Sequence, residues 1–157
     1  MLEQICIARH GNYGSDDRIS DEGKNQMRTL ASALKECWAG LAPITLLTST
    51  APRAQDSAEV LGSILAPATI ASYDCLWSGN DSKHTPKYGD LPAVHALVAE
   101  HRTSAKGIIL VTHLEVSEDY PSHFFQTELK REQHFKEIRK GSAYLIDTKT
   151  GQTRLLP

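Results

Sequence analysis

The chain has 157 residues, of which 40% are hydrophobic and 23% charged, and its 17 basic and 19 acidic side chains give a net charge of -2. This composition is typical of a folded domain and excludes a disordered chain. The near balance of charge argues against nucleic acid as the main ligand, because proteins that bind the phosphate backbone usually carry a strong basic excess. The length predicts one domain over residues 1–157.

The sequence predicts neither a signal peptide nor a membrane span. Residues Met1 to Gln4 lack a basic region followed by an apolar core, and no apolar run approaches the roughly 20 residues that cross a bilayer. The cysteines are too few and too widely spaced for a disulfide framework or a zinc motif; they are Cys6, Cys37 and Cys75. We expect a cytoplasmic protein that binds neither membrane nor nucleic acid, and the sequence leaves its oligomeric state open.

The first half of the chain predicts strands that alternate with helices. Ser20 suits the capping position before a helix, and Pro52 suits the first position of another. The strands are apolar almost throughout, as is typical of strands covered on both faces. The predicted elements are a strand at 2–9, a helix at 21–38, a strand at 44–49, a helix at about 52–65 and a short strand at 68–72.

The second half continues this alternation after an irregular segment. Residues 73–90 are rich in turn-forming residues and predict a long loop, which in a compact domain is often functional. Pro121 interrupts the polar stretch 115–140, of which Phe124 to Lys140 is expected to be helical in part. The remaining elements are a helix from Asp90 to His101, a buried strand at 107–112 and a closing hairpin of 141–147 and 152–155. The alternation predicts a three-layer α/β fold with a mostly parallel central sheet.

Basic side chains follow three of the predicted strands. Arg9 and His10 end the first strand, Arg53 stands at the start of the helix after the second, and His113 follows the strand at 107–112. Ligands of α/β sheets bind beyond the carboxyl ends of the strands. We therefore expect these side chains to share one crevice, although they lie far apart in the sequence.

An anionic phosphoryl group is the ligand that this set of side chains predicts. Arginine binds phosphate oxygens through two parallel hydrogen bonds and keeps its charge, and a neutral imidazole can carry a phosphoryl group covalently. A metal site built from His10, His113 and a loop aspartate is disfavoured, because the arginines beside it would repel a cation. We expect phosphoryl chemistry without a metal or another cofactor.

Four motifs in this order resemble the histidine phosphatase superfamily, also called phosphoglycerate mutase-like. They are Arg9-His10-Gly11 after a strand, residues 19–23 (ISDEG) before a helix, residues 49–58 (STAPRAQDSA) around Arg53, and Val111-Thr112-His113. Residues 141–145 resemble the closing strand of the family. The short chain, which lacks a large insertion after the second strand, is similar to the small SixA-like phosphohistidine phosphatase branch.

The resemblance implies a phosphatase that works through a covalent intermediate on His10. The rest of the phosphate pocket would comprise Arg9, Arg53 and His113. A substrate is also expected to contact Asn12 and Leu114, the latter at a helix N-terminus whose backbone N–H groups suit an anion. The implied substrate is a phosphorylated small molecule or a phosphohistidine protein. A phosphoglycerate mutase-type phosphotransferase and a non-catalytic domain that binds a phospho-ligand remain alternatives.

The proton donor stands in no clear motif. The larger members of the family place it in the loop after the second arginine helix, which here offers Asp74, Asp81 and Asp90, with His84 as a further candidate. We select Asp81, in the position of a glycine–aspartate pair in the SixA-like branch. Glu115 follows the second histidine and is expected to face solvent at a helix start; if it faced the pocket, it would oppose phosphate or act as the acid.

Overall fold

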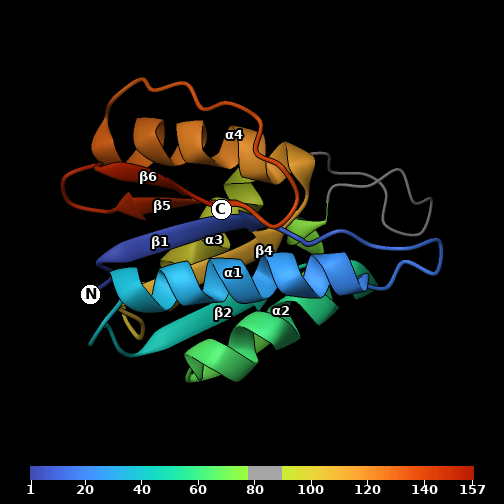
Figure 1. Cartoon of the computed structure of the whole chain (residues 1–157). Coiled ribbons are helices and arrows are strands. Elements are labelled where there is room, and N and C mark those ends of the chain that lie inside the picture. The colour runs from blue at the N-terminus through green and yellow to red at the C-terminus, as the bar shows by residue number, and fades with distance from the viewer. Residues whose placement is uncertain (78–89) are drawn as a thin grey trace.

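The computed structural model describes residues 1–77 and 90–157, and Figure 1 shows one central sheet with helices on both faces. The strands are β1 (Gln4–Arg9), β2 (Ile44–Thr48), β3 (Thr69–Ser72), β4 (Gly107–Thr112), β5 (Ala143–Asp147) and β6 (Thr153–Leu156). The helices are α1 (Asp21–Cys37), α2 (Pro52–Leu65), α3 (Leu91–His101) and α4 (Leu114–Phe124), with a 3₁₀ turn η1 (Asp74–Leu76) and a π-helical turn η2 (Phe125–Leu129).

The sheet has the strand order β3-β2-β4-β1-β5-β6. Strands β1 to β4 pair in parallel, whereas β5 is antiparallel to both β1 and β6. The predicted three-layer α/β fold with a mostly parallel sheet is thereby confirmed. Because β2, β4 and β1 are neighbours that point the same way, the residues that follow them meet at one edge of the sheet.

Two apolar layers hold the helices on the sheet. Cys6 and Ala8 of β1 face the layer under α1 and α2, and Ile5 and Ile7 face the layer under α3 and α4. This alternation follows from the period of two in a strand, and every residue of β2 and β4 is buried, as their apolar runs predict. None of the helices in the described part of the chain is long and apolar enough to cross a membrane.

Helix α4 differs most from the sequence-based expectation. It runs through Pro121, which the sequence suggested as a break. The stretch from Phe124 to Lys140 is helical in part, as expected, and its helical structure ends at Leu129. A proline interrupts a helix because it lacks one N–H and crowds the preceding turn. Here the apolar face of α4, which includes the buried Tyr120, packs against the sheet, and this packing outweighs the local cost of the proline.

Candidate active site

The ends of three neighbouring strands bring the predicted histidines together. The backbone N–H of His10 donates to Thr112 O at 3.0 Å, and that of Ser49 donates to Val111 O at 3.0 Å, so the sheet remains paired up to the site. The ring centroids of His10 and His113 lie only 4.9 Å apart. The structure thus places both imidazoles at the carboxyl edge of the sheet, as the sequence predicted.

Two glycines allow the chain after β1 to pass directly over the start of α1. A Cβ atom on Gly11 would lie 2.7 Å from Gly23 O, and one on Gly23 would overlap Asn12 O. The backbone N–H of Gly11 also donates to Ser57 Oγ of α2 at 3.0 Å. These contacts explain why glycine stands in both motifs, and they fix the backbone that carries His10.

His10 is 3% exposed, and its hydrogen bonds define its tautomer. Nδ1 lies 2.8 Å from Gly11 O, and a carbonyl only accepts, so Nδ1 carries the hydrogen. Nε2 accepts a hydrogen bond from Arg53 Nε at 3.3 Å. Burial lowers the pKa of His10 to about 4. The hydrogen bond to Gly11 opposes this shift, and the positive charges of Arg53, Arg9 and Lys140 add to it. The ring is therefore neutral near pH 7, with the Nε2 lone pair available to an electrophile.

His113 is also buried and neutral. Its Nδ1 lies 3.2 Å from Arg53 Nη2, and a guanidinium only donates, so Nδ1 accepts and Nε2–H donates to Ser49 Oγ at 2.8 Å. Burial first, and then the neighbouring His10 and the arginine charges, lowers the pKa of His113 well below its ordinary value. Both imidazoles therefore direct a lone pair at the same guanidinium.

The guanidinium of Arg53 lies at the centre of the site. Its Nε and Nη2 form one edge of the planar group and donate to the two histidines, while Nη1 donates to Asp17. Its Cζ lies 4.7 Å from the ring centroid of Tyr13 and 5.4 Å from that of Trp77. The two aromatic rings and the carboxylate hold the guanidinium in a defined orientation.

Arg9 presents a second guanidinium to the site. Its Nη1 donates to Ile138 O at 2.9 Å and to Glu137 Oε1 at 3.3 Å. Its Nε is buried and has no hydrogen-bond partner within residues 1–77 and 90–157, although its charge lowers the pKa of both imidazoles. A buried donor without an acceptor is costly, so Arg9 offers an N–H group suited to an anionic ligand.

Sequence reasoning missed Asp17, which lies in the loop between β1 and α1. This residue has a φ of 62° and forms an ion pair with Arg53. The buried Asp56 of α2 fixes the same loop, since it pairs with Arg18 at 2.6 Å and accepts the backbone N–H of Ile19 at 3.0 Å. The sequence does contain a signal for this pairing. An acid and a base are adjacent in the loop (Asp17 and Arg18), and a base and an acid lie three residues apart on one face of the helix (Arg53 and Asp56), so two ion pairs can form between them.

The acids that the sequence singled out do not join this cluster within the described residues. Asp81 and His84 lie outside those residues. Asp74 accepts a hydrogen bond from a threonine hydroxyl at 2.8 Å, and Asp90 caps the start of α3. Glu115 lies half-buried in the first turn of α4. Asp74 and Asp90 thus take part in local structure.

The two predicted substrate contacts differ in what they offer. Leu114 is the first residue of α4, and the N-cap His113 makes no side-chain capping bond to the described residues. The first backbone N–H groups of a helix have no partner within the helix and suit an anion. The backbone N–H of Asn12 donates to Gln26 Oε1 at 2.9 Å, and its carbonyl accepts from Ser20. Among the residues that the structure describes, both backbone groups of Asn12 are thus engaged, and a ligand would meet its side chain.

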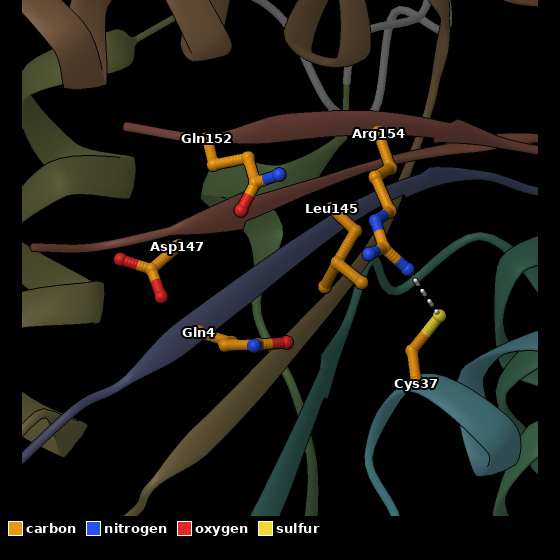
Figure 2. Close-up of a pocket in the computed structure, with 6 residues that line it drawn as sticks. All are labelled: Gln4, Cys37, Leu145, Asp147, Gln152 and Arg154. Carbon is orange, nitrogen blue, oxygen red and sulfur yellow. Dashed lines mark hydrogen bonds between the residues drawn. The ribbon is translucent and has the colours of Figure 1, made fainter. Parts of the chain in front are cut away.

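No group of three or more His, Cys, Asp or Glu side chains in the described part of the chain is placed to hold a metal ion. A separate pocket of about 100 Å³ lies at the opposite end of β1 (Figure 2), where Arg154 Nη1 makes a weak hydrogen bond of 3.9 Å to Cys37 Sγ. Gln4 lines this pocket and begins β1, whereas His10 follows the end of the strand. The pocket is therefore distinct from the histidine site.

No family model matches the chain, and no curated protein sequence does. Solved structures share its fold. The protein histidine phosphatase SixA, solved with tungstate, matches with a TM-score of 0.70 and 20% identity over 97% of this chain and 93% of that chain. The phosphohistidine phosphatase SixA from Agrobacterium tumefaciens matches with a TM-score of 0.69 and 14% identity, over 100% of this chain and 97% of that chain. The mycobacterial glucosyl-3-phosphoglycerate phosphatase, solved with VO3, matches with a TM-score of 0.65 and 16% identity, over 98% of this chain and 97% of that chain. The phosphoglycerate mutase-like fold expected from the sequence is thereby confirmed.

Proposed function

We propose that the protein is a phosphatase of the histidine phosphatase superfamily in which His10 Nε2 accepts the phosphoryl group. The observation that supports this most is the convergence of His10 and His113 on the guanidinium of Arg53, with the charge of Arg9 near enough to lower the pKa of both imidazoles. Structures that share the fold have been solved with tungstate and with VO3. Both are oxyanions, the class of ligand that this pocket would hold.

Binding would begin with an exchange of hydrogen bonds at Arg53. Its Nε/Nη2 edge donates to the two imidazoles in this structure, and the same pair of donors fits two oxygens of a phosphoryl group. The Nε of Arg9, which has no partner among the described residues, would donate to the same group, as would the first turn of α4. Two fixed positive charges then neutralise the oxygens on which charge is spread in the transition state.

The chemical step forms a bond from His10 Nε2 to phosphorus while the bond from phosphorus to the leaving group breaks. The hydrogen bond from Nδ1 to Gly11 O holds the reactive tautomer and stabilises the positive charge that the phosphorylated ring acquires. The leaving group takes up a proton. Water then attacks the phosphohistidine, releases inorganic phosphate and restores the neutral ring.

The substrate in this proposal is a phosphomonoester or a phosphohistidine side chain. A groove of about 600 Å³, lined by residues of α1 and by Arg139 and Lys140, lies beside the site and gives room for the rest of a larger molecule. We place this single-domain enzyme in the cytoplasm, where its three free thiols would stay reduced, and assign it no cofactor.

Substitution of His10 by alanine tests the proposal. The wild-type protein should release phosphate from p-nitrophenyl phosphate and form an acid-labile phosphoenzyme after a denaturing quench, and His10→Ala should do neither. His134→Ala, at an exposed histidine, serves as the control. Full phosphatase activity in His10→Ala would rule out the mechanism. Binding without turnover would identify a phospho-ligand binding domain, and isomerisation of phosphoglycerate without net release of phosphate would identify a mutase.

A further inference from the structure

We propose that Lys140 binds a second anionic group of the substrate, so that the enzyme selects phosphomonoesters in which a carboxylate or a further phosphate lies a few bonds from the reacting phosphoryl group. This site rests on the function proposed above and narrows its substrate class. Lys140 Nζ lies over the ring of Tyr13, 4.6 Å from the centroid, and the centroids of the Tyr13 and His10 rings are 5.2 Å apart. One aromatic ring therefore separates the ammonium group from the proposed nucleophile.

The backbone around Lys140 is tied to the end of the strand that carries His10. The N–H of the next residue, Gly141, donates to the carbonyls of Arg9 and His10, at 3.1 and 3.0 Å. Gly141 has a φ of 78°, which glycine adopts readily, and a Cβ atom there would approach a side chain of α1 to 2.5 Å. On the other side of Lys140, Ile138 O accepts from Arg9 Nη1 at 2.9 Å. The fold thus fixes Lys140 relative to both Arg9 and His10.

Lys140 differs from the other two cations near His10 because it has no carboxylate partner among the described residues. The two arginines of the site pair with Asp17 and Glu137, whereas no ion pair within residues 1–77 and 90–157 includes Lys140. Its charge acts on the site, since it contributes to the lowered pKa of His10. A fixed cation at a cleft raises the local concentration of anions, and this one is available to a ligand.

The ring of Tyr13 limits how far the second anion would lie from phosphorus. Arg53 Cζ is 4.7 Å from the centroid of this ring and Lys140 Nζ is 4.6 Å from it, so the two charges can be no further apart than these two distances placed end to end. A phosphoryl group on Arg53 and a second anion on Lys140 would therefore belong to one compact molecule with a short linker. An uncharged leaving group would gain nothing from the ammonium charge.

The groove of about 600 Å³ beside the site gives such a molecule room, and Lys140 lines it. Gln26 of α1 lines the same groove and accepts the backbone N–H of Asn12 at 2.9 Å, so the groove begins beside the turn that follows His10. Its lining from the described residues includes one carboxylate, Glu22, which forms no ion pair with Lys140. The ammonium group thus lies where the proposed phosphoryl pocket meets the groove.

Two matched aryl phosphates test this site. 3-Carboxyphenyl phosphate and 3-carbamoylphenyl phosphate have nearly the same shape, and only the first carries a negative charge apart from the phosphoryl group. Lys140 is half-buried, so the wild-type protein should prefer the carboxylate ester in kcat/KM by about 5–20-fold, between the effects of an exposed ion pair and a charge-assisted hydrogen bond. Lys140→Gln should abolish this preference, and Lys140→Arg, which keeps the charge, should retain most of it.

The ratio between the two esters isolates the second anion, because a change in the chemical step alters both esters alike. Lys136→Gln is the matched control, since Lys136 is an exposed lysine of the same segment, and it should leave the ratio at the wild-type value. The wild-type preference should also shrink as the salt concentration rises, because salt screens a partly exposed charge pair.

A wild-type enzyme that hydrolyses both esters equally well, or a Lys140→Gln variant that keeps the preference, would overturn the proposal. Failure of the proposed phosphatase function would give a different result, because neither ester would then be hydrolysed. In that case the dissociation constants of the two esters, measured by isothermal titration calorimetry, should show the same preference and its loss in Lys140→Gln. Equal constants in the wild-type protein would overturn the second anion site on their own.

Discussion

Ser49 Oγ lies 2.8 Å from His113 Nε2 and also accepts the backbone N–H of Ala51 at 3.1 Å. Ser49 is fully buried, and its hydroxyl can both accept and donate. In this structure it accepts from Nε2–H while His113 Nδ1 accepts from Arg53. In the proposed function a phosphoryl oxygen would replace the Arg53 donor. The Ser49 hydroxyl would then rotate to donate to Nε2, and Nδ1–H would donate to the phosphoryl oxygen. We therefore expect Ser49 to let His113 change from acceptor to donor while the ring remains neutral.

Replacement of Ser49 by alanine should lower turnover and prevent this change of tautomer. An unpaired buried ring nitrogen costs about 1–3 kcal/mol, which corresponds to roughly 5–150-fold in kcat on p-nitrophenyl phosphate. Nitrogen-15 NMR of the wild-type protein should show the proton of His113 move from Nε2 to Nδ1 when vanadate binds. Ser63→Ala, on the exposed side of α2, should change neither measurement. A tautomer that stays the same in wild type with vanadate would contradict the prediction.

The buried neutral His10 should make the fold sensitive to mild acid. Its pKa is lowered from 6.5 to about 4 in the native protein, so the unfolded chain gains a proton first as the pH falls. The stability that the neutral ring contributes is present above pH 6.5 and is lost as the pH falls towards 4. The difference corresponds to roughly 3 kcal/mol at 1.36 kcal/mol per pKa unit, and the lowered pKa of His113 acts in the same direction.

Urea unfolding of wild type and His10→Asn at several pH values between 7.5 and 4.5 measures this effect. The free energy of unfolding should fall less steeply with pH in His10→Asn, because asparagine does not titrate. His134→Asn, at an exposed position, should follow the wild-type curve. Parallel curves for His10→Asn and wild type would show that His10 does not resist protonation in the native state.

The parts of the site that the sequence predicted are those that adjoin regular elements. Arg9, His10 and His113 follow apolar strands, and Arg53 follows the proline that starts a helix, so strand and helix patterns were sufficient to place all four. Asp17 was missed because its role depends on a turn with positive φ and on a partner in a different element, neither of which leaves a periodic pattern. The predicted break at Pro121 was wrong because α4 is kept helical by the packing of its apolar face against the sheet, which local helix propensity does not describe.

Arg9 should matter through the geometry of its donors rather than through charge alone. Arg9→Lys keeps the positive charge but removes the buried Nε–H that has no partner among the described residues. Loss of one such donor to a transition state costs about 10²–10³-fold in kcat. Glu137→Gln is the comparison, because Glu137 is 61% exposed and Ile138 O still holds Arg9 Nη1 at 2.9 Å.

An exposed ion pair contributes about 0–1 kcal/mol, so Glu137→Gln should change kcat/KM by less than about fivefold. Steady-state kinetics on p-nitrophenyl phosphate and the inhibition constant of vanadate measure both variants. If Arg9→Lys retained wild-type turnover, or if Glu137→Gln were as damaging as Arg9→Lys, the assignment of the Arg9 donors to the phosphoryl group would be wrong.

Replacement of Gly23 by alanine should disturb the backbone that carries His10, the proposed nucleophile. Alanine normally stabilises a helical position by up to about 1 kcal/mol relative to glycine. At Gly23, however, the added Cβ would overlap Asn12 O and approach Ile19 Cγ1 to 2.6 Å, and the backbone carbonyl cannot move without displacing the turn after His10. Overpacking of this kind costs about 1–3 kcal/mol, so Gly23→Ala should lower both the urea midpoint and kcat.

Gly62→Ala provides the matched control for this effect. Its Cβ would approach only the terminal Cδ1 of Ile70, which belongs to a half-exposed and movable side chain. The helix propensity of alanine should therefore prevail there, and Gly62→Ala should be as stable as wild type or more so, with unchanged kcat. A Gly23→Ala protein with wild-type stability and turnover would show that the close approach of the two backbone segments does not position His10.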